Sequence, residues 1–354
     1  MEAEVGLSPM AALPQPTVDA IYAAYEKRNA AEQPRAYLGA SEIGESCDRR
    51  LWLSLRNVGR EKFDGRMLRL FQTGHREELR IIEDLRAIGC TVYDKDPATG
   101  QQWRYSALDG HLSCGLDGVV TGMPEAPETP HLLEVKTSNE KNFRKLEKEG
   151  VEKAKPVHFA QMQLCMGMAD LTRAVYIVQN KNTDELYFER VEYSDKTYKA
   201  LLLRAKRIIS AESPPDRISA DPTFYVCRFC PFLETCHGEK MPAVSCRTCV
   251  HSSPAADQKW RCANGLPMDA GCGEHLFVPD LLHWAEPLDG DPSWVKYKVK
   301  STGREFVNVA ASGFPAMDLP HYGSSELANC KVPAIGEPMV EAARAILGGK
   351  VVSP

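Results

Sequence analysis

One short run of the sequence restricts the fold more than any other. In the apolar run 131–137, Glu134 and Lys136 alternate with Leu133 and Val135. Side chains two positions apart share a face of a β-strand, so the two charged groups are expected to lie together on one side of a strand. Burying a lone charge there is costly, and the pair therefore needs a partner or a chemical task. The structural alternative is a buried ion pair between Lys136 and an acid.

A second acid lies on a neighbouring predicted strand. Asp117 belongs to the run 114–120, with sixteen residues between it and Glu134. Two carboxylates and a lysine on adjacent strands would form a divalent-metal site with an electrostatic helper beside it.

Length and charge set further limits. The 354 residues are enough for about two domains, and no apolar run reaches the length of a membrane span. The chain begins with Glu2 and Glu4 instead of a basic and then apolar signal pattern, so a cytoplasmic location is expected. The net charge of −5 does not indicate a general nucleic-acid coat. Residues 49–86 nevertheless carry ten Lys/Arg against six Asp/Glu, which fits either a phosphate track or a solvated helix face.

Periodicity divides the chain into three parts. Residues 1–37 form a Pro/Ala-rich lead and a helix, residues 38–239 an α/β body, and residues 240–354 a loop-rich, Pro/Gly-punctuated module. In the body, a long helix ending near Gly89 precedes three strands, two helices, two more strands and a final helix. The strands are expected at 102–107, 111–121, 131–137, 172–179 and 185–193, and the later helices at 140–150, from Pro156, and through 201–209. This order predicts a mixed α/β core with helices packed on a small sheet.

The twelve cysteines indicate metal ligation, because disulfides are rare in a reducing compartment. Cys227, Cys230 and Cys236 follow one another closely, and Cys47 is the best candidate for a fourth ligand. Four thiolates suit either zinc or an iron–sulfur cluster. A second set has the spacing of a structural zinc knuckle and comprises Cys246, Cys249, Cys262 and Cys272.

A rival grouping of the cysteines stays open. Cys227, Cys230, Cys246 and Cys249 together have the C-x2-C-x15-C-x2-C spacing of a zinc ribbon. This grouping would leave Cys47, Cys236, Cys262 and Cys272 without a role, so it ranks second.

Several motifs in a fixed order carry a family resemblance. They are Gly74-His75 in the first long helix, Asp117, the run 134–136, Gln161 in the Pro156 helix, and the frame of Cys47 with Cys227, Cys230 and Cys236. Over residues 38–237 the chain resembles the PD-(D/E)XK nuclease superfamily. It is most similar to the RecB-like branch with an iron–sulfur cluster, which includes CRISPR-adaptation exonucleases and the nuclease domain of AddB. Cys165 stands where the family often has a tyrosine.

The resemblance implies a role for each matching residue. Asp117, Glu134 and the backbone carbonyl of Val135 would hold Mg²⁺ or Mn²⁺, and His75 would complete the shell and favour Mn²⁺. Glu78 is an alternative ligand on the same helix. Lys136 would orient water or stabilise developing charge, with Gln161 beside it. The four frame cysteines would bind a [4Fe–4S] cluster as a structural staple.

The resemblance also implies a function. It predicts a metal-dependent deoxyribonuclease, an exonuclease above all, acting in recombination, repair or phage DNA processing. DNA would be the substrate. The residues after 240 lie outside the resemblance, and we expect them to dock DNA or a phage recombination or replication protein. The alternative is a catalytically idle DNA-binding or scaffold protein in which iron–sulfur and zinc sites serve as staples.

Overall fold

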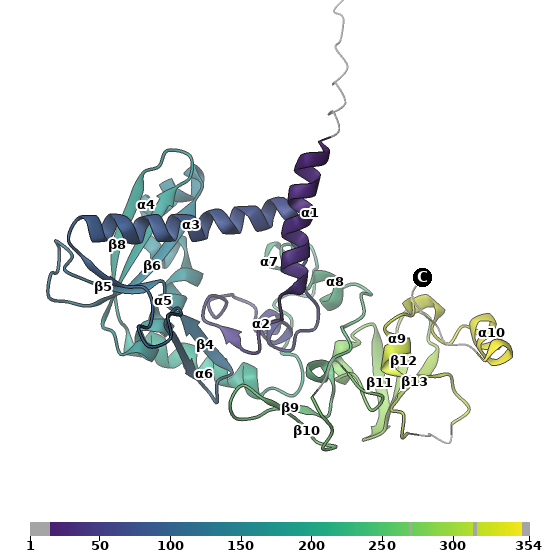
Figure 1. Ribbon diagram of the computed structural model, residues 1–354. Coiled ribbons are helices and arrows are strands. Elements are labelled where there is room, and N and C mark those ends of the chain that lie inside the picture. Colours follow the sequence, from purple (N-terminus) through teal and green to yellow (C-terminus); the bar gives the residue numbers. More distant parts are fainter. Residues whose placement is uncertain (1–14, 269–270, 314–316, 349–354) are drawn as a thin grey trace, which may run out of the picture.

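The first two long helices cross each other at a glycine. The computed structural model describes residues 15–268, 271–313 and 317–348. Helix α1 (Pro16–Ala31) packs across the N-terminal end of α3 (Gly65–Ala87) (Figure 1). A Cβ at Gly65 would stand 2.3 Å from the backbone oxygen of Tyr22, so only glycine permits this approach. In the part of the chain that is described, no helix has the length and apolar character needed to cross a membrane.

A five-stranded mixed sheet forms the centre of the body. Its order is β2 (Thr91–Tyr93), β5 (Gly118–Thr121), β6 (His131–Ser138), β7 (Arg173–Asn180) and β8 (Leu186–Glu192). Only β6 and β7 pair in parallel, and the crossover between them contains α4 (Glu140–Ala154) and α5 (Pro156–Ala169). This confirms the predicted mixed α/β architecture, and β6, β7 and β8 begin and end within a few residues of the expected strands.

Alternation along β6 and β7 sends side chains to two different layers. Leu133, Val135 and Ile177 lie in a cluster with Ile82 and Leu85 of α3. On the opposite face, the side chains lie in the larger core, which α5 and α6 (Asp195–Ser210) cover. Glu134 and Lys136 have the parity of this second face, which is therefore the face that α5 approaches.

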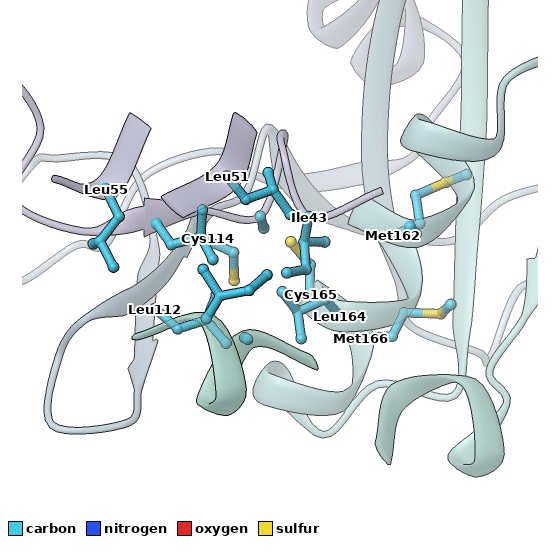
Figure 2. Packing of buried hydrophobic residues seen from close by; sticks show 14 of the residues in the cluster. Ile43, Leu51, Leu55, Leu112, Cys114, Met162, Leu164, Cys165 and Met166 are labelled. Carbon is cyan, nitrogen blue, oxygen red and sulfur yellow. The ribbon is translucent and has the colours of Figure 1, made fainter. Parts of the chain in front are cut away.

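The strand expected over 111–121 is two strands in two sheets. β4 (Leu112–Gly115) lies between β1 (Leu38–Gly39) and β3 (Arg104–Ala107), whereas β5 belongs to the central sheet. Leu116 and Asp117 form the junction, so Asp117 lies where the chain passes from one sheet to the other. Figure 2 shows the core here, in which Leu112 and Cys114 approach Leu164 and Cys165 of α5.

Cys47 immediately precedes α2 (Asp48–Leu55), whose first turn is held by α6. Arg204 and Arg207 of α6 both pair with Asp48, and Arg204 also donates to the Ile43 carbonyl. Two short helices, α7 (Tyr225–Arg228) and α8 (Leu233–Cys236), carry the later cysteines. The segments that bear both halves of the predicted cysteine frame are therefore ordered parts of the body.

Residues after 240 contain a sheet that the sequence interpretation did not predict. A short turn η1 (Cys246–Thr248) and the hairpin of β9 (Ser252–Pro254) and β10 (Trp260–Cys262) come first. A four-stranded sheet follows, formed by β11 (Ala285–Asp291), β12 (Trp294–Val299), β13 (Glu305–Val309) and β14 (His321–Tyr322), with η2 (Pro279–Leu281) before it. Helix α9 (Ser324–Leu327), the turn η3 (Val332–Ala334) and α10 (Pro338–Leu347) complete it. Its core is aromatic and includes Phe277, Trp284, Tyr297, Phe306 and Tyr322.

The C-terminal part is packed onto the body by specific contacts. Val278 and Leu281 belong to the same core as Leu51 and Leu132. Arg56, only 2% exposed, donates to the carbonyls of Arg247, Ser252 and Ala211. Its guanidinium also stacks on two tryptophans, one from each part: Trp52 at 5.1 Å and Trp260 at 4.8 Å. Residue 240 thus marks a change along the chain from long periodic elements to short, Pro/Gly-punctuated segments. The packing of the core continues across it.

Candidate active site

The acidic and basic groups singled out in the sequence meet beside β6. The backbone N–H of Val135 donates to Asp117 Oδ2 at 2.9 Å, which fixes the carboxyl at the sheet junction against the middle of β6. The Lys136 ammonium pairs with Glu134 Oε1 and donates to the Val135 carbonyl at 3.2 Å. One ammonium therefore lies against the Glu134 carboxylate and the adjacent carbonyl.

Gln161 on α5 is the fourth side chain of this group, after Asp117, Glu134 and Lys136. Its side-chain amide on α5 donates to Glu134 Oε2 at 2.9 Å, and both side chains are buried. The other oxygen, Oε1, receives no geometrically sound hydrogen bond from any described residue and faces only the Lys136 ammonium. Gln161 thus holds the carboxylate in one orientation and leaves Oε1 directed at a cation.

Electrostatics at the site follow from burial and from crowded charges. Burial raises the pKa of Glu134, and Asp117 adds to this effect while Lys136 opposes it. Burial also disfavours the ammonium of Lys136, but the carboxylates of Glu134 and Asp117 outweigh it and the pKa of Lys136 is raised. The lysine is therefore held firmly in its charged form.

Helix α3 contributes an acid, and it is Glu78. Burial, followed by the neighbouring Asp117, raises the pKa of Glu78 to about 7, and Lys136 opposes the shift. His75 lies one turn earlier with a side chain 81% exposed, and its Nδ1 is 3.9 Å from Glu78 Oε2. The structure thus brings Glu78 into the electrostatic neighbourhood of Asp117 and Lys136 and leaves His75 at the rim.

Two residues that the sequence interpretation missed line the same region. Tyr176 on β7 is the register partner of Glu134 on β6, so the two lie side by side. Its hydroxyl is 2.6 Å from Nδ1 of His158, which lies on α5 one turn before Gln161. The register of β7 relative to β6 is the only signal that could have linked this tyrosine to the site.

The donor set fits a hard divalent cation. Two carboxylates and a backbone carbonyl supply oxygen ligands, and the ammonium of Lys136 already touches two of these three groups. Within the described residues, no three His, Cys, Asp or Glu side chains are gathered so that they could bind one ion together. At this site, a carbonyl oxygen would take the place of a third side chain.

The two predicted cysteine sets line two different cavities. Cys47, Cys227, Cys230 and Cys236 line one cavity together with Arg49 and Arg217. A different cavity is lined by Cys246, Cys249, Cys262 and Cys272 together with His251 and His275. The rival ribbon grouping would need ligands from both cavities, so the placement favours the first-ranked grouping.

Within each cavity the thiols influence one another. Burial raises the pKa of Cys227, and Cys236 and Cys47 raise it further. Burial likewise raises the pKa of Cys249, to which Cys262 and Cys272 add. Each cavity thus offers four thiols, the kind of donor that zinc and iron–sulfur clusters take, but the described side chains are not gathered into a ligand group.

Comparisons with known proteins gave matches in structure only. The sequence matches no family description and no curated protein. Among solved structures, SSO0001 aligns with 61% of this chain and 94% of its own, at 9% identity and a TM-score of 0.38. LHK-Exo in complex with dAMP aligns with 53% of this chain and 89% of its own, at 16% identity and a TM-score of 0.37. The alkaline exonuclease LHK-Exo from Laribacter hongkongensis aligns over the same shares at 18% identity and a TM-score of 0.35.

Proposed function

We propose that the protein is a metal-dependent nuclease that hydrolyses phosphodiester bonds in DNA, and that it is an exonuclease. The observation that carries the proposal is the convergence of Asp117, Glu134 and Lys136 beside the Val135 carbonyl. A buried ion pair alone would need one acid and one base. Here, two further acids, Asp117 and Glu78, lie near the same lysine, and repulsion among the carboxylates contributes to the raised pKa values of Glu134 and Glu78.

In this proposal, Asp117, Glu134 and the Val135 carbonyl hold Mg²⁺ or Mn²⁺, with Glu78 and His75 as the candidates from α3. The ion, when bound, activates water and polarises the phosphate. Gln161 keeps the Glu134 carboxylate in place by donating to Oε2. Lys136, anchored on the strand next to the Val135 carbonyl, supplies a fixed positive charge for the phosphoryl oxygens as negative charge develops on them.

Two cysteine sites are part of the proposal. Cys47, Cys227, Cys230 and Cys236 would bind a [4Fe–4S] cluster, and Cys246, Cys249, Cys262 and Cys272 would bind zinc. What supports each is the shared cavity of its four cysteines. Both would be structural: the cluster would join Cys47 to a segment distant in sequence, and the zinc would close a short loop-rich segment, so that each reduces the entropy of the unfolded chain. The C-terminal part would then help to dock DNA or a recombination or replication protein.

The test is cleavage of defined DNA. Linear single- and double-stranded DNA labelled at either end, and closed circular DNA, are incubated with the purified protein and Mn²⁺ or Mg²⁺, with a chelator as control. We expect cleavage of the linear forms only with metal, and resistance of the circular form. Cleavage of the circular form would make the protein an endonuclease. Binding without cleavage under every metal condition would instead support an idle DNA-binding scaffold.

A further inference from the structure

We propose that His158 is a substrate-contacting residue that donates a hydrogen bond from Nε2 to a phosphate oxygen of the DNA backbone, and that Tyr176 positions it. This inference rests on DNA being the ligand of the site, as proposed above. It gives α5 a second role, DNA binding through His158, in addition to the contact of Gln161 with Glu134. It also gives a positioning role to Tyr176 on β7.

Helix spacing on α5 and the strand register of β6 and β7 together place His158 and Tyr176 beside the site. On α5, His158 and Gln161 are three positions apart and therefore share a helix face, the face from which Gln161 reaches Glu134. On the sheet, Tyr176 is paired directly with Glu134. The contact of 2.6 Å between the Tyr176 hydroxyl and His158 Nδ1 closes the group.

The tautomer of His158 follows from the tyrosine. Tyr176 is 1% exposed, and in the part of the chain that the structure covers its hydroxyl contacts only the His158 ring. A buried hydroxyl must donate its single proton to avoid the cost of an unsatisfied donor, so Nδ1 accepts and the ring proton lies on Nε2. Burial also raises the pKa of Tyr176, which keeps the hydroxyl protonated.

Burial and nearby positive charge keep the imidazole of His158 neutral. Burial, then Lys136 and Lys155, lower the pKa of His158 to about 3. A neutral ring with Nδ1 occupied can neither accept a proton nor ligate a metal through that atom, and its Nε2–H can only donate. His158 is half-buried, and with Nδ1 taken by Tyr176, Nε2 is the ring nitrogen left for a ligand.

The neighbouring charge selects the acceptor. His158 shares its helix face with Gln161, whose amide contacts the Glu134 carboxylate that pairs with Lys136. The ligand that Nε2–H meets is therefore one that an ammonium also attracts. A phosphate oxygen satisfies both donors, whereas a neutral carbonyl would use only one of them. The pair Lys136 and His158 would then contact the DNA backbone without regard to base sequence.

Three variants test the proposal: His158→Leu, His158→Gln, which keeps a side-chain N–H donor, and Tyr176→Phe. Binding of a short single-stranded DNA is measured by fluorescence anisotropy in Ca²⁺, so that cleavage does not enter the readout. His158→Leu should weaken binding about tenfold, the loss of one hydrogen bond to a charged group. His158→Gln should recover most of that loss, and Mn²⁺ affinity should be the same in both.

The ring itself provides an independent readout. Nitrogen chemical shifts should show His158 protonated on Nε2 in the wild type, and a mixture of tautomers in Tyr176→Phe. A ring protonated on Nδ1, or equal DNA binding by His158→Leu and the wild type, would overturn the inference. DNA binding that depends on His158 in a protein that never cleaves DNA would instead refute the proposed nuclease activity and leave this role intact.

Discussion

Val135 and Asp117 are joined by a 2.9 Å hydrogen bond from the backbone amide of one to the carboxylate of the other. This bond ties the junction between two sheets to the strand that carries Glu134 and Lys136. It also orients one carboxylate oxygen and leaves the other available. The position of the Asp117 carboxylate relative to Glu134 and Lys136 is therefore fixed by the backbone of β6. The acidic group, meaning Asp117 and Glu134, has little freedom to rearrange independently of the sheet.

Replacing the charged residues at the site should abolish cleavage without unfolding the protein. Asp117→Asn, Glu134→Gln and Lys136→Met each keep the approximate size of the side chain and remove its charge. We expect losses of at least about 10²–10³-fold in the rate of DNA cleavage, as when one preorganised group is removed from an active site. Cleavage rates and thermal unfolding are measured together. Full activity in Lys136→Met would contradict the assignment.

Gln161→Ala should weaken metal binding. The Gln161 amide fixes Glu134 Oε2, and loss of such an orienting partner usually lowers metal affinity by about 10- to 100-fold. The matched control is Gln163→Ala on the same helix, because Gln163 contacts Glu192 and Ser194 and not Glu134. Mn²⁺ titration followed by calorimetry should show the loss only in Gln161→Ala. A loss of the same size in both would mean that α5 as a whole had been disturbed.

The acidic group should make metal binding depend on pH. The pKa of Glu78 is raised to about 7 from an ordinary 4.5, so the folded protein takes up a proton there that the unfolded chain does not bind. The resulting stabilisation is fully present below about pH 4.5 and is lost as pH rises through about 7. Asp117, Asp94 and Lys136 are the charged groups that influence Glu78.

A divalent ion should reverse this loss, because it favours the ionised carboxylates. We therefore expect the rise in melting temperature on adding Mn²⁺ to be small near pH 5.5 and to increase through about pH 7. Glu78→Gln should reduce this dependence, and Glu134, whose pKa is raised as well, should retain the remainder. A metal effect that is constant over this range would contradict the expectation.

Single cysteine changes should separate two metal sites. Anaerobically purified protein should carry about four irons and about one zinc per chain. Cys47→Ser should remove the iron, and Cys249→Ser should remove the zinc and spare the iron, because the two residues line different cavities. Elemental analysis of both variants decides between the groupings. Zinc alone, lost from Cys227→Ser and Cys249→Ser alike, would favour the single ribbon.

Arg56→Met should destabilise the whole protein. The substitution removes the Arg56 donor from the carbonyls of Arg247 and Ser252, and one of the two donors from the carbonyl of Ala211, which keeps its bond from the Trp52 indole. It also removes the contacts of the guanidinium with the rings of Trp52 and Trp260, for a total loss of about 2 kcal/mol in the free energy of unfolding. The control is Arg60→Met, whose guanidinium reaches the exposed carbonyls of Asn29 and Ala30 and should cost less than about 0.5 kcal/mol. Urea unfolding of both variants measures the difference.

The sequence predicted most of the body because its elements have a clear period. The alternation through 131–137 and the apolar spacing of the long helix both led to the observed elements. The break at Leu116 and Asp117 was missed although Gly115, Asp117 and Gly118 are residue types that strands disfavour, because the apolar residues on both sides were treated as one strand. The pairing of β4 with β1 and β3, and of β5 with β2 and β6, divides the run. The C-terminal sheet was missed although Trp294–Val299 alternates, because Pro and Gly on either side suggested loops.

The site was predicted in part for the same reason. The structure brings together four residues that the sequence singled out because each lies in a local motif: Asp117, Glu134, Lys136 and Gln161. Tyr176 carries no such motif, and the strand register places it beside Glu134. On α3, the sequence interpretation ranked His75 before Glu78. The two residues are three positions apart and share a helix face, so the sequence does not show which of them lies nearer to the sheet.

The shared core has a consequence for the order in which the molecule can be made. Val278 and Leu281 fill the same core as Leu51 and Leu132, so the body lacks part of its interior until the ribosome has passed residue 281. The acidic group, complete in sequence by residue 161, would have to wait for more than a hundred further residues before its supporting layers closed. A chain released early would carry every residue of the site on an unfinished scaffold.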